Sequence, residues 1–255
     1  MATANGKRAA WELLGGAYWG SGYRGGPSPE DCSTYLAGLS PGAATAIIGA
    51  STRDLVAGAV GLGCRTHVID FSARMCDDLL GNVGDVISCT VHDITQAAPP
   101  SLHGRFDAIL ADRLLNRFSA TELTASLRTI LSLLSPGGEF RTSVRVGLYE
   151  RDLPILARAW TIGRFNDVFE PDGGHIDYAP VAGHLPAILP PHGEIPSELV
   201  AEFYRLRGRE KRLRPGELEG IVGGIADDDG RLAVERCVKL ADQPDELFTI
   251  VRRSH

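Results

Sequence analysis

Between residues 44 and 146 the sequence alternates short apolar runs with amphipathic runs, and this alternation constrains the fold more than any other feature. The apolar runs predict strands buried on both faces, and the amphipathic runs predict the helices that connect them. Units of this kind form a parallel sheet with right-handed crossovers. We expect strands at 44–48, 66–69, 86–91, 106–110 and 139–146, and helices at 53–59, 72–80 and 119–134.

The segments outside this region predict how the sheet is completed. Residues 232–240 and 247–251 predict an antiparallel strand pair. Further helices are expected at 28–39, 198–206 and 215–222. The expected fold class is therefore α/β, a Rossmann-like doubly wound seven-stranded sheet that is mostly parallel, with an antiparallel C-terminal strand pair and an inserted lid.

The same patterns divide the chain into four segments. Residues 1–27 have little periodicity, so their order is expected to depend on what they cover. Residues 147–196 are rich in Pro, Gly, Asp and His, and we expect a largely structureless lid with one helix near 153–160. The predicted segments are an N-terminal cover with the first helix (1–40), a cofactor-binding core (41–146), a substrate lid (147–200) and the C-terminal completion of the sheet (201–255).

Composition narrows the class of partner. The 255 residues carry a formal net charge of -6, which disfavours a nucleic-acid partner because such proteins usually present a basic surface. The five cysteines form no Cys-x-x-Cys pair, so they indicate neither a disulfide framework nor a thiolate zinc site. No stretch reaches the roughly 20 apolar residues of a membrane span. We expect a cytoplasmic protein without a membrane partner.

Acidic residues follow several predicted strands, at the sheet edge where ligands bind in doubly wound folds. Gly49 begins the first strand-to-helix turn, where backbone amides can approach a ligand, although a turn can need glycine for its shape alone. Asp70 is placed to accept hydrogen bonds from ribose hydroxyls, or else to cap the next helix. Asp93 suits an exocyclic amine such as that of adenine, or a solvated loop. Asp112 is expected beside the reaction centre, and Asp107 at the opposite edge.

These segments together resemble the class I S-adenosylmethionine-dependent methyltransferases. Residues 47–51 resemble the glycine loop of that family, 68–72 its ribose acid, 92–93 its adenine acid, 106–115 its fourth-strand motif, and 133–140 its Leu-x-Pro-Gly-Gly segment. The resemblance covers about residues 28–146, and more loosely 204–251. It implies S-adenosyl-L-methionine as cofactor and these core residues as its contacts: Gly49, Ala50, Ser51, Asp70, Phe71, Met75, His92, Asp93, Asp112 and Arg113.

The glycine loop departs from the family pattern. An acid usually precedes the first glycine by two positions, and two further glycines follow, but this chain has Ile47, Ser51 and Arg53 there. The methionine end of the cofactor is therefore expected to be held differently. Our hypothesis is that side chains of the N-terminal cover supply what the loop lacks, and the candidates are Tyr18, Tyr23 and Arg24.

The resemblance implies in-line methyl transfer to an oxygen or nitrogen atom of a small molecule, for which we expect a specialised metabolite. Such chemistry chiefly needs alignment and exclusion of water, and a histidine can serve where a base is required. The candidate bases are His175 and His184 in the lid. The candidate substrate residues are Asn116, Trp160, Phe165 and Tyr178. No metal-binding pattern appears in the sequence. The sequence does not decide whether the protein forms a homodimer.

Two other functions are compatible with this sequence. The same sheet and ribose acid would serve an NAD(P)-dependent oxidoreductase, although Gly-x-Gly-x-x-Gly is absent. The altered loop is also compatible with a methyltransferase-like protein that binds the cofactor without transferring methyl.

The basic stretch 205–214 has two interpretations as well. It could bind an acidic or phosphorylated substrate or an RNA backbone, but the interpretation favoured by charge patterning is a solvated helix edge.

Overall fold

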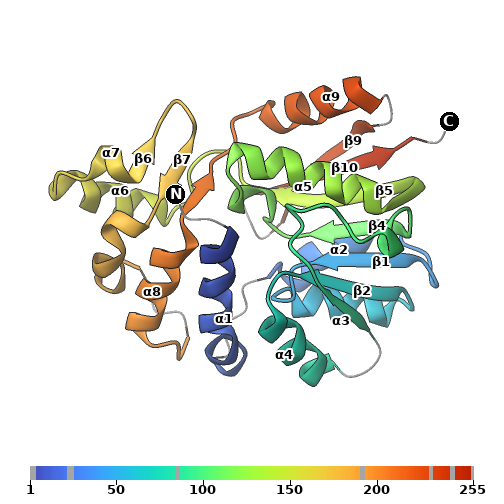
Figure 1. Cartoon of the computed structure of the whole chain (residues 1–255), viewed down its shortest axis with the longest axis horizontal. Coiled ribbons are helices and arrows are strands. Elements are labelled where there is room, and N and C mark those ends of the chain that lie inside the picture. Colours follow the sequence, from blue (N-terminus) through green and yellow to red (C-terminus); the bar gives the residue numbers. More distant parts are fainter. Residues whose placement is uncertain are drawn as a thin grey trace.

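The computed structural model describes residues 4–21, 26–83, 87–189, 193–229, 232–241 and 245–253, and Figure 1 shows its arrangement. A seven-stranded sheet has the strand order β3-β2-β1-β4-β5-β10-β9, and β10 runs antiparallel to both of its neighbours. The other neighbours pair in parallel. The strands are β1 (Ala44–Ile48), β2 (Arg65–Asp70), β3 (Ser88–Val91), β4 (Phe106–Ala111), β5 (Leu134–Val144), β9 (Leu232–Lys239) and β10 (Glu246–Arg252). The predicted fold class is confirmed.

Helices cover both faces of this sheet and give it two apolar cores. On one face, α2 (Pro29–Leu36), α3 (Arg53–Gly61) and α4 (Ala73–Val83) pack against Ile47, Val68 and Leu110. On the other, α5 (Ala120–Leu133) and α9 (Glu217–Asp229) pack against the alternate strand residues. The strand order reverses between β1 and β4, so the helices that follow β4 cover the other face of the sheet. Doubly wound sheets bind ligands at such a reversal.

Local sequence signals fix where several elements begin. Ser28 caps α2, its hydroxyl accepting from the Asp31 amide. Ser119 and Glu122 form a complete capping box at α5, as their spacing predicts. Strand β5 begins at Leu134, earlier than the expected 139, because its pairing with β4 continues across an irregularity in register.

The N-terminal segment is more regular than its sequence predicts, since Ala4–Gly20 form a long helix, α1. Its glycines obscured the helical pattern, but two of them serve packing. A Cβ added at Gly15 or Gly16 would lie 3.0 or 2.5 Å from the side chain of Arg74 on α4. These two glycines lie where α1 contacts α4 (Figure 1).

The helix expected near 153–160 is confirmed, but the prediction that the rest of 147–196 is structureless is wrong for the residues that the structure describes. They form α6 (Asp152–Thr161), α7 (Phe165–Val168), β6 (Phe169–Glu170), β7 (His175–Asp177) and a 3-10 helix at Ala179–Ala187. Strand β8 (Arg209–Lys211) joins β6 and β7 in a second, three-stranded sheet. Helix α8 (Ser197–Arg207) then connects this region to α1 (Figure 1).

The favoured interpretation of the basic stretch as a solvated edge is also wrong for its central part. Arg207, Glu210, Lys211 and Arg212 are all buried, with Glu210 fully inaccessible. A single carboxylate, that of Glu210, is shared by arginines from different parts of the chain. Charge patterning failed here because these cations are neutralised by tertiary partners and not by solvent.

Candidate active site

Two adjoining cavities lie at the carboxyl ends of β1, β2, β3 and β4. The larger has a volume of about 160 Å³ and the smaller about 50 Å³. Both are bordered by the segments that follow β1 and β2, so they form one continuous site. The residues that line both are Lys7, Ile48, Gly49, Asp70, Phe71, Leu114 and Phe118.

The turn after β1 and the acid after β2 are joined directly. Gly49 adopts a φ of 107°, a conformation that favours glycine. The Ala50 amide donates to one carboxylate oxygen of Asp70 at 2.7 Å, and the Ser72 amide donates to the other at 2.8 Å. Burial raises the pKa of Asp70 to about 6, although these amides oppose the shift. A carboxylate has about four acceptor positions, so Asp70 retains capacity to accept from a ligand.

The end of β3 borders the smaller cavity with His92 and Asp93. One oxygen of Asp93 accepts from the amide and the hydroxyl of Thr95, at 2.9 and 2.8 Å. The Nε2 atom of His92 is buried and has no hydrogen-bond partner among the described residues. Because a buried polar atom without a partner is unusual, this nitrogen marks a position that a ligand could satisfy.

Asp112 follows β4 and lines the larger cavity. Its carboxylate accepts from the hydroxyls of Ser143 and Tyr35, at 2.8 and 3.2 Å, and burial raises its pKa. The next residue, Arg113, has a φ of 49°, which is uncommon for a residue with a side chain and often occurs at functional sites. The Arg113 side chain turns to Asp245 on the loop before β10.

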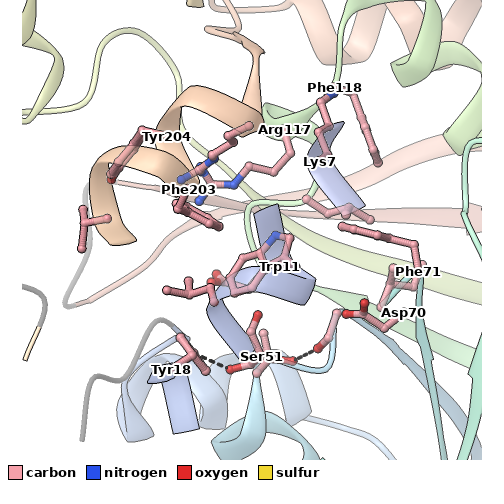
Figure 2. A pocket seen from close by; sticks show the side chains of 18 of the residues that line it. Lys7, Trp11, Tyr18, Ser51, Asp70, Phe71, Arg117, Phe118, Phe203 and Tyr204 are labelled. Atoms are coloured by element: carbon pink, nitrogen blue, oxygen red, sulfur yellow. Dashed lines mark hydrogen bonds between the residues drawn. The ribbon is translucent and has the colours of Figure 1, made fainter. Parts of the chain in front are cut away.

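One face of α1 forms a wall of the larger cavity through Lys7, Trp11, Leu14 and Tyr18. Figure 2 shows Trp11 between the end that contains Asp70 and the end that contains Phe203. The Tyr18 hydroxyl donates to the Ser51 carbonyl at 2.9 Å. The Arg8 guanidinium donates to the Phe71 carbonyl at 2.8 Å, and Lys7 pairs with Glu122 at 2.6 Å. Helix α1 is thus held to the loops after β1 and β2 and to α5.

The end of the larger cavity farther from Asp70 is built by residues that sequence reasoning did not select. Arg117 precedes α5, Arg151 precedes α6, and Phe203, Tyr204 and Arg207 lie on α8. Figure 2 shows Arg117, Phe203 and Tyr204 on the far side of Trp11. The sequence signal that pointed to this wall was the basic stretch 205–214, for which binding of an acidic substrate was one of the two interpretations.

The structure brings many of the predicted cofactor residues to these cavities. The residues that line one or both are Tyr18, Gly49, Ser51, Asp70, Phe71, His92, Asp93 and Asp112. Ala50 contributes through its amide to Asp70, and Met75 is buried in the core beneath. The side chain of Arg113 points to Asp245. Tyr23 and Arg24 lie outside the described residues.

The predicted substrate and catalytic side chains lie elsewhere, so their predicted roles have no geometric support. Asn116 is fully buried and bridges backbone groups of Arg145 and Lys211. Tyr178 is also fully buried, and its hydroxyl donates to Asp152 at 2.9 Å. Trp160 is 73% exposed and contacts the ring of Phe165 on the surface of α6 and α7.

Neither predicted histidine lines the cavities. His175 lies on β7, with Nδ1 3.4 Å from the Glu170 carboxylate. Burial, reinforced by nearby Arg209 and Lys211, lowers its pKa. His184 is 3.2 Å from the Arg158 guanidinium. Both were selected because the segment was expected to fold over the site, whereas it forms a sheet and helices of its own.

No group of three or more His, Cys, Asp or Glu side chains in the described ranges is arranged to hold a metal ion. None of the helices in the described part of the chain combines the length and apolar character of a membrane span.

Comparisons with known proteins place this fold. No protein-family model and no curated protein sequence matches the chain. A Rhodobacter sphaeroides structure with the provisional name Zn-dependent alcohol dehydrogenase is 33% identical, has a TM-score of 0.89, and the match covers 99% of this chain and 100% of that one.

Two methyltransferases are similar in fold at lower identity. The Burkholderia thailandensis 1,6-didemethyltoxoflavin-N1-methyltransferase, crystallised with S-adenosylhomocysteine, is 14% identical with a TM-score of 0.56, and the match covers 98% of this chain and 89% of that one. The magnesium protoporphyrin IX methyltransferase of Synechocystis PCC 6803, also with S-adenosylhomocysteine, is 14% identical with a TM-score of 0.58, and the match covers 97% and 99%.

The sheet order and these similarities define a protein with the class I methyltransferase fold. Within that class, the chain belongs to the same family as the Rhodobacter sphaeroides protein.

Proposed function

We propose that this protein is an S-adenosylmethionine-dependent methyltransferase that acts on a small molecule. The observation that carries the proposal is the convergence of Gly49, Asp70 and Asp93 on one continuous site. They follow three neighbouring strands of a sheet with the methyltransferase strand order. This is the arrangement needed to hold a nucleoside across the carboxyl ends of parallel strands.

The residues around the cavities fit this cofactor. The Asp70 carboxylate would accept from the ribose hydroxyls while its two amide bonds keep it oriented. The His92 Nε2 atom, which has no partner among the described residues, and Asp93 would contact the adenine. The cofactor, when bound, supplies a methyl group on a positively charged sulfur. The similar methyltransferases crystallised with S-adenosylhomocysteine support the same assignment.

The chain's own contribution to transfer would be alignment and exclusion of water. Trp11 and Tyr18 on α1, with Phe203 on α8, form an apolar wall that would orient the acceptor. No histidine lines the larger cavity in the portion of the chain that is described. We therefore propose transfer to an oxygen or nitrogen atom by proximity, without a histidine base. The toxoflavin N-methyltransferase, crystallised with 1,6-didemethyltoxoflavin, supports a small-molecule acceptor, for which we propose a specialised metabolite.

The name of the Rhodobacter sphaeroides relative suggests an alternative, a zinc- and nicotinamide-dependent oxidoreductase. Two observations disfavour it. The described residues offer no group of three metal-ligating side chains. The antiparallel β10 lies between β5 and β9, whereas a dinucleotide-binding sheet continues in the order 3-2-1-4-5-6.

Titration calorimetry with S-adenosylhomocysteine and, separately, with NAD tests the assignment. We expect S-adenosylhomocysteine to bind and NAD not to bind. Binding of NAD alone would overturn the proposal in favour of an oxidoreductase. A second measurement follows transfer of a radiolabelled methyl group from S-adenosylmethionine to a panel of phenols, amines and carboxylic acids. Cofactor binding with no transfer to any acceptor would instead favour a methyltransferase-like binding protein.

A further inference from the structure

The two ends of the larger cavity differ in charge. Asp70 and Asp112 lie at the end formed by the strand termini. Three arginines, which we call the arginine cluster, lie at the opposite end: Arg117, Arg151 and Arg207. Between these ends the wall is apolar and aromatic. The positively charged end therefore suits a negatively charged acceptor, which would lie beside the proposed cofactor site.

The buried carboxylates near the arginine cluster are already engaged. Glu210 pairs with Arg117 at 2.9 Å, with Arg212 at 3.2 Å, and also with Arg207. Asp152 binds Arg212 through both oxygens, at 2.6 and 3.1 Å. Three guanidinium groups (those of Arg117, Arg207 and Arg212) therefore share two carboxylates, and the addition of Arg151 gives this region an excess of positive charge.

Among the described residues, Arg151 is the cation of this network that no carboxylate contacts directly. It forms no ion pair within the described part of the chain, and its Nε atom is buried without a hydrogen-bond partner there. One terminal nitrogen lies 3.5 Å from the Tyr204 hydroxyl, and the guanidinium stacks 4.8 Å from the centroid of the Tyr149 ring. A buried, charged donor without an acceptor is costly unless something absent from the protein itself supplies one.

Arg151 also keeps its charge. Burial alone would lower its pKa, but nearby Tyr204, Tyr178 and Glu210 outweigh burial, so its pKa stays well above the ordinary value. Lysine could not replace this geometry fully, because the planar guanidinium presents a fork of donors that matches a carboxylate.

We propose that the arginine cluster binds a carboxylate group of the acceptor substrate, whose apolar body lies against Trp11 and Phe203. Arg151 is the main contact, and Arg117 and Arg207 add positive potential while they remain paired with Glu210. The inference rests on the proposed function, since it names the substrate class of the same site. The acceptor is thus an aromatic or otherwise apolar acid, and not a neutral or cationic compound.

The test compares acids with their neutral amides on protein saturated with S-adenosylhomocysteine. The probes are 4-hydroxybenzoate and indole-3-acetate, each paired with its carboxamide, with binding measured by calorimetry and by Trp fluorescence. We expect each acid to bind at least about tenfold more tightly than its amide, since a hydrogen bond to a charged group contributes that much. Equal affinity of acids and amides, or no acid binding, would overturn the inference.

Substitutions of single arginines distinguish binding at this site from an effect of the overall charge of the protein. Arg151→Gln should abolish the preference for acids without changing the affinity for S-adenosylhomocysteine, and Arg151→Lys should retain part of it. Arg205→Gln is the matched control, because Arg205 lies on α8 near Arg207 but is exposed and paired with Glu202. A preference for acids that survives Arg151→Gln in a folded protein contradicts the assignment.

These outcomes distinguish the inference from the proposed function. If S-adenosylhomocysteine itself does not bind the unmodified protein, the proposed function fails. If it binds but the acids are not preferred, only the inference about the acceptor fails.

Discussion

Asp70 is the residue at which local structure and proposed binding meet. Its carboxylate receives two backbone amides, one from the loop after β1 and one from the start of α4. The alternatives of ribose acceptor and helix cap are therefore not exclusive, since the same group can orient the turn and still accept from a ligand. Ser72 caps the helix as well, its hydroxyl accepting from the Met75 amide at 3.1 Å.

Cofactor binding should depend on pH through Asp70. Burial raises the pKa of this carboxyl to about 6, so the group is ionised at pH 8 and largely protonated at pH 5. Only the ionised form accepts hydrogen bonds at full strength. The association constant for S-adenosylhomocysteine should therefore fall as pH drops below 6, approaching about tenfold per pH unit. Calorimetry between pH 5 and pH 8 measures this, and a flat profile would contradict it.

Asp70→Asn should lower the affinity for S-adenosylhomocysteine by about tenfold or more, since a charge-assisted hydrogen bond is lost. It should also remove the pH dependence. Asp77→Asn makes the same change of charge at an exposed position on α4 and should alter neither property. If both variants weaken binding equally, the effect is one of overall charge and not of the site.

At the scale of elements, α1 and α5 are coupled by one side chain. The Glu122 carboxylate completes the capping box of α5 by accepting from the Ser119 amide at 2.8 Å, and it also pairs with Lys7 of α1 at 2.6 Å. The start of α5 therefore helps to hold the helix that walls the cavity. The capping box was predicted from the spacing of Ser119 and Glu122, but the contact with α1 was not.

Ser119→Ala should destabilise the protein by about 1 kcal/mol, because it removes the acceptor for the Glu122 amide. In a chain of this size that change corresponds to a decrease in melting temperature of roughly 2 to 4 °C. Thr121→Ala, at an exposed position in the same first turn, is the control and should leave the melting temperature unchanged. Calorimetric melting of both variants decides the matter, and equal shifts would argue against the cap.

Across the molecule, a buried ion pair joins α6 to the segment that follows the smaller sheet. Asp152 is fully inaccessible and Arg212 is 3% exposed, and they lie 60 residues apart in the sequence. The Asp152 carboxylate also accepts from Tyr178 and from the Tyr149 amide, at 2.9 and 2.8 Å. This pair fixes α6 against the segment after β8, and so it positions Arg151, the neighbour of Asp152.

Asp152→Ala should lower the free energy of unfolding by about 3 to 5 kcal/mol, because it removes both bonds from Asp152 to the buried Arg212 and leaves that charge only the Glu210 carboxylate, which Arg117 and Arg207 already share. Denaturant unfolding measures the change. Glu202→Ala removes one partner of an exposed ion pair on α8 and should leave the unfolding midpoint unchanged. A small effect of Asp152→Ala would mean that water reaches Arg212 once the carboxylate is removed.

Local sequence patterns were enough to predict the main sheet, the capped helices and the loops that carry Gly49, Asp70 and Asp93. Buried strands and helix caps depend on residues close together in the chain, so their positions can be predicted from local periodicity and spacing. The early start of β5 and the elements of 147–196 other than the helix near 153–160 were not predicted, since short irregular elements depend on their partners for stability.

The arginine wall of the site, in contrast, depends on how distant elements pack against one another. Arg117, Arg151 and Arg207 meet at one wall although 90 positions separate the first from the last. No local pattern records such contacts, because they arise when distant elements pack and share buried carboxylates such as Glu210. For the same reason His175 and His184, plausible by residue type, lie away from the cavities: residue type indicates what a side chain can do, and packing sets where it does it.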